Sequence, residues 1–194
     1  MTNAEVFRPR SGYILAGILI AGSILLVLQT LLYSTGEDLW ATIFWAVSIV
    51  FASYWLFIHP KVTVYDEGIT IHNPFRVISV SWAHVEDIDV QYSMSITVAG
   101  RKIHAFAAPA PGRYHARTIH PNEIKGLRVS NPENMRPGES PRTHSGVATH
   151  LARLRYEAFH KGNFANATFN ESFDRNGVLA IASLIVGCII AWLL

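Results

Sequence analysis

An uncharged run of 21 residues, Tyr13 to Tyr33, limits more strongly than any other feature what this chain can fold into. A helix of that length crosses a bilayer core of roughly 30 Å, whereas shorter apolar runs suffice for buried helices of soluble proteins. A signal peptide is the alternative, but its apolar core usually has about 7–15 residues and a small-residue cleavage site, which does not follow here. The sequence therefore predicts a transmembrane helix over 13–33, preceded by a polar tail over 1–12.

Two further apolar runs extend this prediction to three spans. Leu39 to Ile58 is also uncharged, with aromatic residues near both ends, as at membrane interfaces. Val178 to Leu194 ends the chain with 17 apolar or small residues, at the short limit for spanning. We predict transmembrane helices over 39–58 and 178–194.

Basic residues predict the orientation of these spans. The connection between the first two spans holds Glu37 and Asp38 and neither Lys nor Arg. The tail holds Arg8 and Arg10, and the segment 59–175 holds the other 14 of the 16 Lys and Arg residues, including Lys61 and Arg175 close to the spans. Because cytoplasmic flanks are enriched in Lys and Arg, we expect the N-terminus and the segment 59–175 to be cytoplasmic and the C-terminus external, in a multi-pass protein of the cell membrane.

The stretch from Lys61 to Ala107 is typical of short antiparallel strands. Apolar and polar residues alternate over 61–65 and 69–72, on either side of a turn at Asp66 to Gly68. Similar runs follow at 75–82, 85–92, 96–99 and 102–107, with no helical pattern between them. We predict a six-strand antiparallel sheet or small barrel rather than a parallel α/β sheet.

The second half of the segment has a different texture. Residues 108–144 are rich in Pro, Gly, Arg and His and form a long irregular loop, which in a compact domain is usually functional or disordered. A helix over 145–161 is predicted next, capped by Ser145, with an inward apolar stripe of Val147, Leu151, Leu154 and Ala158. Residues 163–177 lead to the last span and either lie at the headgroups or pack on the domain.

The order of these motifs resembles a known family. The motifs are a turn with acids before Gly at Tyr65 to Ile69, then Asn73 to Arg76, then Val80 to Trp82 followed by Val85, and a C-terminal helix. This resembles the bacterial pleckstrin-homology-like (PH-like) domains of actinobacterial membrane proteins, of the low-molecular-weight protein antigen 6 type. The resemblance implies two roughly orthogonal sheets closed by the helix and implies no activity. The prediction is an α+β membrane protein: three transmembrane helices plus a cytoplasmic antiparallel PH-like β barrel or sandwich over 59–162, capped by a C-terminal helix.

The sequence contains few residues that indicate a binding site for phosphate, lipid or metal. Phosphoinositide binding, the best-known PH activity, is disfavoured because Asp66 and Glu67 occupy the first hairpin and would repel phosphate. Anionic lipid attraction through Lys61, Lys161 and Arg175 remains open, beside the simpler interpretation as positive-inside flanks. A composite metal site of His104, His115 and His120 is conceivable, although their spacing matches no known motif.

Other functional classes are excluded by composition and motif. A net charge of +2 is too small to indicate nucleic-acid binding, and the single cysteine, Cys188, rules out a disulfide framework. Neither a Gly-x-Ser-x-Gly elbow nor a phosphate-binding Gly loop occurs, so we expect no enzyme activity and no cofactor. Trp82 and Val85 are assigned to the core together with Leu151 and Leu154.

The predicted function is a non-catalytic accessory or scaffold subunit of a larger membrane protein complex of unknown identity, in contact with membrane lipids. Small residues at four-residue spacing let helices approach closely, either within this chain or against another protein. The candidate interface residues are Gly17 and Ala21 in the first span, Ser183, Gly187 and Ala191 in the third, and Arg113, Arg117, Arg128 and Arg136 in the loop. The alternatives are a sensor of the anionic inner membrane surface and a metal-dependent enzyme.

Overall fold

The computed structural model describes residues 3–33, 36–110, 143–162 and 168–193. The chain divides into two compact units. One contains 1–9 and 61–172, and the other contains 10–60 and 173–194. A strand-rich domain is therefore inserted between helices of one helical unit.

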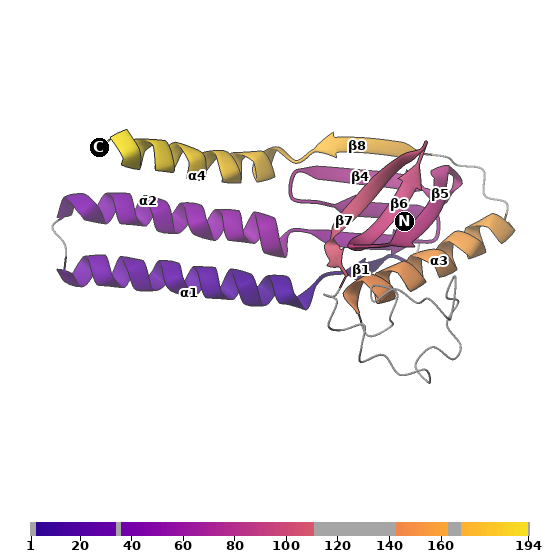
Figure 1. Cartoon of the computed structure of the whole chain (residues 1–194), viewed down its shortest axis with the longest axis horizontal. Helices are drawn as coiled ribbons and strands as arrows, with labels where there is room; N and C mark the ends of the chain where they lie inside the picture. Colours follow the sequence, from indigo (N-terminus) through magenta and orange to yellow (C-terminus); the bar gives the residue numbers. More distant parts are fainter. Residues whose placement is uncertain (1–2, 34–35, 111–142, 163–167, 194) are drawn as a thin grey trace. The chain divides into compact units, whose positions relative to one another are not determined.

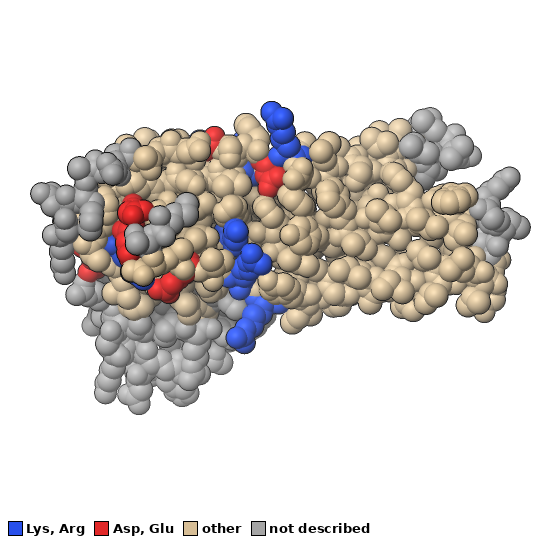
Figure 2. Space-filling model, turned by 180° about the vertical axis from the view of Figure 1, so that it is seen from behind, with Lys and Arg blue, Asp and Glu red and all other residues tan. Residues whose placement is uncertain are grey.

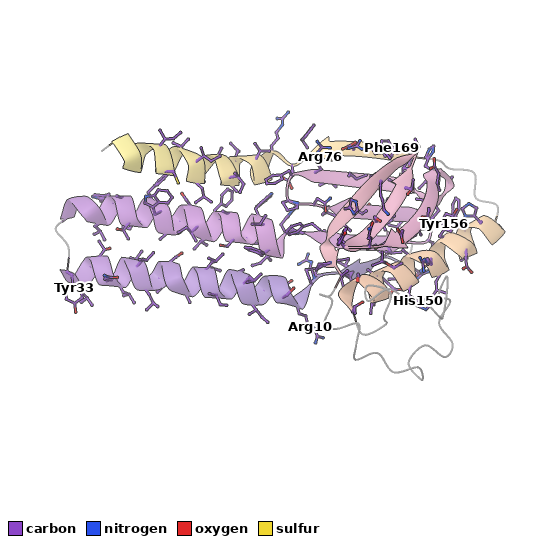
Figure 3. All side chains as sticks on the ribbon, viewed as in Figure 1. Arg10, Tyr33, Arg76, His150, Tyr156 and Phe169 are labelled. Carbon is purple, nitrogen blue, oxygen red and sulfur yellow. The ribbon has the colours of Figure 1, made fainter. Side chains whose placement is uncertain are left out.

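The helical unit has three helices (Figure 1). They are α1 (Arg10–Tyr33), α2 (Gly36–Ser53), which continues into a π-helical turn (Tyr54–Ile58), and α4 (Arg175–Leu193). α2 packs against both α1 and α4. Arg10 and Tyr33 mark the two ends of α1 (Figure 3).

Two of the three predicted spans have the length and apolar character to cross a membrane. They are Arg10–Tyr33 and Leu39–Ile58. The third predicted span is not among them, because the described apolar stretch of α4 covers Arg175–Ile189. The whole of α4 has 19 residues and at 1.5 Å per residue reaches about 28 Å, close to the roughly 30 Å of a bilayer core.

The strand domain contains two antiparallel sheets, as the resemblance to PH-like domains implied, rather than the single meander or closed barrel that the alternation alone predicted. In the first, the strand order is β1-β2-β3-β4-β8, and in the second it is β5-β6-β7. The first sheet comprises β1 (Glu5–Phe7), β2 (Lys61–Tyr65), β3 (Gly68–His72), β4 (Arg76–Ser81) and β8 (Phe169–Phe173). The second comprises β5 (Val85–Val90), β6 (Ser93–Val98) and β7 (Arg101–Pro109).

The two outer strands of the larger sheet come from segments that were predicted to be a tail and a juxtamembrane stretch. β1 pairs with β2 in the register Val6 to Thr63, and β8 lies beside β4. In addition, the Ser81 N–H donates to the Thr168 carbonyl at 2.8 Å, just before β8. The segment up to Ser172 is therefore part of the domain.

The core lies between the sheets and is centred on Trp82, which is fully buried. Its indole N–H donates to the Tyr65 carbonyl at 3.0 Å, so burial leaves no polar atom of this side chain unsatisfied. Val85 is also buried. Tyr156 of α3 (His144–Gly162) meets the Trp82 ring edge-on, with 6.1 Å between the ring centroids.

Helix α3 is rotated relative to the prediction. Its buried residues are Ser145, Ala148, Thr149, Ala152 and Phe159. Leu151 is partly buried, whereas Leu154 and Val147 are each 45% exposed and Ala158 is exposed. The assignment of Leu154 to the core was wrong, because Ala148 and Ala152 let the helix backbone come closer to the sheets than larger side chains would.

The cap of α3 also differs from the prediction. The Gly146 N–H donates to the Thr143 hydroxyl at 3.0 Å, and the Val147 N–H donates to the Thr143 carbonyl at 3.0 Å. Thr143 is thus the N-cap, and Ser145 lies inside the first turn with its side chain buried.

Candidate functional site

The first hairpin of the domain, where PH domains are expected to bind phosphate, is occupied by internal ion pairs. Arg155 of α3 pairs with the Asp66 carboxylate and, at 2.9 Å, with Glu5 of β1. The Asn3 side-chain amide also donates to Asp66, at 2.9 Å. These contacts hold β1, the hairpin and α3 together. Two carboxylates around one guanidinium, with Glu67 next in the chain, give an acidic hairpin that disfavours a phosphate ligand.

A second polar contact joins the two sheets through Asn73. Its side-chain N–H donates to the His104 carbonyl at 2.8 Å, and its side-chain oxygen accepts from the Phe106 N–H at 2.9 Å. A single amide thereby satisfies two backbone groups of β7, as a neighbouring strand would. We call this contact the Asn73 clip. It fixes the β3–β4 turn to β7.

Glu171 makes the corresponding contact for β8. Its carboxylate pairs with Arg76 of β4 at 3.2 Å and with Arg101 of β7 at 3.0 Å. Because Arg76 and Arg101 are in different sheets, Glu171 attaches β8 to both. The last strand before α4 is therefore attached firmly to the domain.

In the helical unit, charge is concentrated where α1 and α4 begin and α2 ends. Asp174 caps α4 by accepting from the Asn176 N–H at 3.2 Å, and its other oxygen lies 3.6 Å from His59 Nε2. A Cβ on Gly12 would come within 2.3 Å of the Phe57 carbonyl oxygen, so the start of α1 is also at this end. Arg10, His59 and Arg175 consequently lie toward the same end of the unit. On the face seen in Figure 2, the described helical surface away from that end shows no Lys, Arg, Asp or Glu.

The two small-residue stripes predicted as interfaces have different environments. A Cβ on Gly187 would lie 2.8 Å from Phe44 Cε1, so the small-residue stripe on α4 packs against α2 of the same chain. A Cβ on Gly17 would meet nothing within 4 Å, and Gly17 and Ala21 are both exposed. Ser183 is half-buried, with its hydroxyl donating to the Ala180 carbonyl at 2.8 Å. The α1 stripe is thus available for another helix, while the α4 stripe is used internally.

The other predicted site residues are only partly within the described structure. Arg113, Arg117, Arg128 and Arg136 lie outside the described residues, as does the side chain of Ala191. Of the proposed histidine set, His115 and His120 also lie outside, and His104 has Nδ1 3.4 Å from the Ser93 hydroxyl. Across the described residues, no group of three or more His, Cys, Asp or Glu side chains is arranged to hold a metal.

Sequence reasoning missed Asn73, Glu171 and Arg155 as structural contacts. The sequence signal for β8 was weak, because three consecutive polar residues separate Phe169 from Phe173 and the apolar and polar residues do not alternate. The amide of Asn73 gave no such signal. Its partners are 31 and 33 residues away in the chain.

The architecture defines a class of protein: a PH-like domain of two antiparallel sheets and a C-terminal helix, inserted into a unit of apolar helices. Residues 59–119 match the family model of the bacterial PH domain, which is consistent with the PH-like domain that the sequence motifs predicted. The match contains β2 to β7, whereas β1, α3 and β8 lie outside it. Neither the comparison with curated proteins nor that with solved structures found a significant match.

Proposed function

We propose that this protein is a membrane-anchored PH-like interaction module, a non-catalytic accessory subunit of a larger membrane protein complex. The observation that carries the proposal is the exposure of α1. Only 11% of its most apolar window is buried. A soluble core helix of this composition would be mostly buried.

The distribution of exposed side chains favours lipid over a single protein partner as the surroundings of α1. Successive helical residues are about 100° apart, so an interface with one partner exposes one stripe. In α1, three consecutive large side chains are exposed near each end and near the middle. They are Tyr13, Ile14 and Leu15, then Ile24, Leu25 and Leu26, then Leu31, Leu32 and Tyr33. Apolar exposure over more than one stripe, on the faces of α1 that α2 does not cover, fits a bilayer.

The charge distribution supports an orientation with the domain in the cytoplasm and the C-terminus external. Arg10 and Arg175 are both exposed and lie at the end of the helical unit from which the chain enters or leaves the domain. Glu37 and Asp38 belong to the first turn of α2, at the opposite end of the unit. This asymmetry follows the positive-inside rule.

The role as an accessory subunit is supported by apolar surfaces that the described chain leaves uncovered. On α3, Val147 and Leu154 are each 45% exposed and flank the partly buried Leu151. This spacing is that of helix anchors that dock in a partner's groove. On α1, Gly17 and Ala21 offer a close helix approach within the membrane. The Arg- and Pro-rich stretch of sequence between β7 and α3 is the third proposed contact.

Two measurements test the proposal. Alkaline carbonate extraction of native membranes should leave the protein in the pellet, and its appearance in the supernatant would refute anchoring. Gentle-detergent purification of the tagged full-length chain should then recover a stoichiometric membrane complex.

Matched variants locate the contact. Gly17→Leu should reduce recovery of the complex, while Leu32→Ile, on an exposed part of the same helix, should leave recovery unchanged. Recovery of the protein alone would reject the accessory role and favour the alternative, a sensor of anionic lipid. Salt-sensitive binding to anionic vesicles by the full chain would test that alternative.

A further inference from the structure

His59 and Asp174 form an ion pair of the helical unit to which the proposed function assigns no role. His59 is the C-cap of the π-helical turn that ends α2, and Asp174 accepts from the N–H groups of Asn176 and Gly177 in the first turn of α4. The His59 Nε2 atom lies 3.6 Å from the second Asp174 carboxylate oxygen. With 21% and 12% of their side chains exposed, both partners are largely removed from water. The pair therefore joins the end of α2 to the start of α4.

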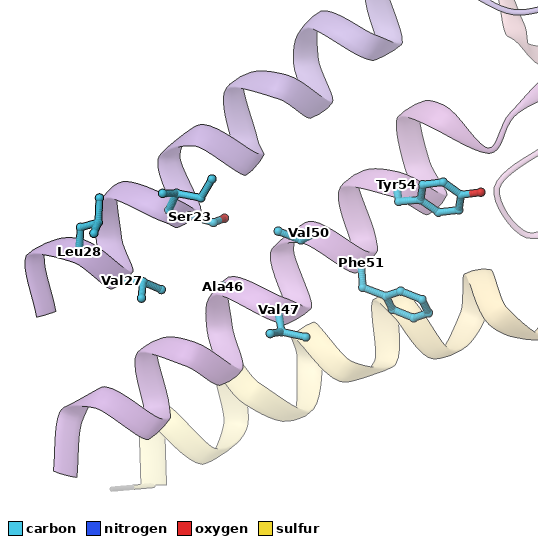
Figure 4. Close-up of a pocket in the computed structure, with 9 residues that line it drawn as sticks. Ser23, Val27, Leu28, Ala46, Val47, Val50, Phe51 and Tyr54 are labelled. Atoms are coloured by element: carbon cyan, nitrogen blue, oxygen red, sulfur yellow. The ribbon is translucent and has the colours of Figure 1, made fainter. Parts of the chain in front are cut away.

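One face of the His59 imidazole is covered by Trp55, which lies one turn earlier in the chain. The two rings are stacked, with 4.6 Å between their centroids and 12° between their planes. Phe51 and Tyr54 contact the Trp55 ring in turn, at centroid distances of 5.7 and 5.4 Å, and also line an apolar groove between α1 and α2 (Figure 4). The imidazole is thus held at its edge by a carboxylate and on its face by an indole.

Each of these contacts favours the protonated imidazole over the neutral one. A cation is attracted to a carboxylate, to the face of an indole and to the C-terminus of a helix, and His59 lies at all three. Asp174 is favoured as an anion by the N-terminus of α4. Because the pair is largely buried, solvent screens its attraction less than that of a surface pair. Protonation of His59 should therefore strengthen the contact between α2 and α4.

Two effects act in the opposite direction and are weaker. Burial disfavours a charged group, but about a fifth of the His59 side chain remains exposed. Arg10 and Arg175 repel an imidazolium, but both side chains are exposed and therefore screened by salt. The other titratable residues in the elements that pack against the turn, or next to it in the chain, are Tyr13 of α1, Tyr54 of the turn itself and Lys61. Phenols are ordinarily neutral and lysines ordinarily charged below about pH 9, so the imidazole is the group whose charge changes near neutral pH.

We propose that the His59–Asp174 pair is a pH-sensitive latch, which fastens the end of α2 to the start of α4 when His59 is protonated. An imidazole ordinarily takes up its proton near pH 6.5, so the stabilisation is present in full in mild acid and is lost as the pH rises through this region. The chain enters the strand domain directly after residue 60 and returns from it directly before residue 173. The latch therefore determines whether these two connections are held together.

The test is the melting temperature of the helical unit in the full-length protein in mild detergent, measured at about pH 5.5 and about pH 8. Asp174→Asn keeps an oxygen that caps α4 and removes only the charge. The melting temperature at the lower pH, minus that at the higher, should be about 5 °C larger in wild type than in this variant. His59→Gln should lose the same difference and serves as the second variant. His84→Gln, at an exposed histidine of the strand domain, is the matched control and should behave as wild type does.

A double variant separates pairing from packing. The non-additivity of His59→Gln and Asp174→Asn in the melting temperature should be about twofold or more larger at the lower pH, because only there does the pair carry two charges. Non-additivity of the same size at both pH values would overturn the proposal, since packing alone would then account for the contact. A pH difference in Asp174→Asn or His59→Gln equal to that of wild type would overturn it as well.

Discussion

Gly68 is the residue at which one added methyl group should damage the domain most. It lies opposite Ser81 in the β3–β4 register. A Cβ there would be 2.3 Å from the Val80 carbonyl oxygen and 3.0 Å from the Ser81 Cα, whereas ordinary contact begins near 3.4 Å. Both neighbours are backbone atoms, so no side chain can turn away. In Gly68→Ala, β4 would have to move by about 1 Å.

The cost follows from the hydrogen bonds that such a movement stretches. The Trp82 N–H donates to the Glu67 carbonyl at 3.1 Å, immediately beside Gly68, and the Trp82 indole donates to Tyr65 at 3.0 Å. Together with the nearest β3–β4 ladder bond, about three hydrogen bonds are weakened at about 1 kcal/mol each. We expect a loss of about 3 kcal/mol in the free energy of unfolding, which lowers the melting temperature of a domain of this size by about 10 °C or more.

Thermal unfolding of the full-length protein in mild detergent, followed by circular dichroism, measures this loss. Gly100→Ala is the matched control in the same domain. Its Cβ would meet nothing within 4 Å, but its φ of +72° favours glycine, so we expect a cost of about 1 kcal/mol. If Gly68→Ala unfolds at the same temperature as Gly100→Ala or above it, the inferred close approach of β3 and β4 is refuted.

Three further changes test other contacts. Thr143→Ala removes the cap that accepts from the Gly146 N–H and should destabilise the domain by about 1 kcal/mol in the same assay, while Thr143→Ser, which keeps the hydroxyl, should not. Asn73→Ala removes the two hydrogen bonds of the Asn73 clip and should lower the free energy of unfolding by about 1–3 kcal/mol. Amide hydrogen exchange along β7 should become faster, and unchanged exchange there would contradict the clip. Gly187→Leu should destabilise the helical unit by about 1–3 kcal/mol through overpacking against α2 and so lower its melting temperature, whereas Gly17→Leu should leave that temperature unchanged. Equal effects would contradict the different environments of the two stripes.

For helix α3, the sequence periodicity predicted a helix at the correct position but predicted burial of the wrong helix face. The stripe of Val147, Leu151 and Leu154 is the more hydrophobic one, and a pattern of 3.6 residues favours it for burial. The domain buries the neighbouring stripe of Ala148 and Ala152 instead. Which of two adjacent stripes faces inward depends on the shape of the surface that receives the helix, and that surface is formed by residues distant in sequence.

The contacts that organise the site were hidden for a similar reason. Glu171 is 95 residues from Arg76 and 70 from Arg101, and Arg155 is 89 from Asp66. Polar pairs of this kind leave no periodic signal, and any of the acidic side chains was a possible partner for any of the basic ones. Only folding brings them within hydrogen-bond distance.

By itself, the sequence determined the features that depend on local or averaged properties: the apolar runs that form α1 and α2, the alternation that forms β2 to β7, and the motifs typical of the bacterial PH domain, whose family model matches residues 59–119. Each is decided by residues a few positions apart, through helix length, strand period and turn chemistry. The tertiary structure decided which strands form each sheet, the recruitment of β1 and β8, the face of α3 and the use of Gly187 but not Gly17 within the helical unit. These depend on packing and hydrogen bonds between segments far apart in the chain, whose free energies exist only once the segments meet.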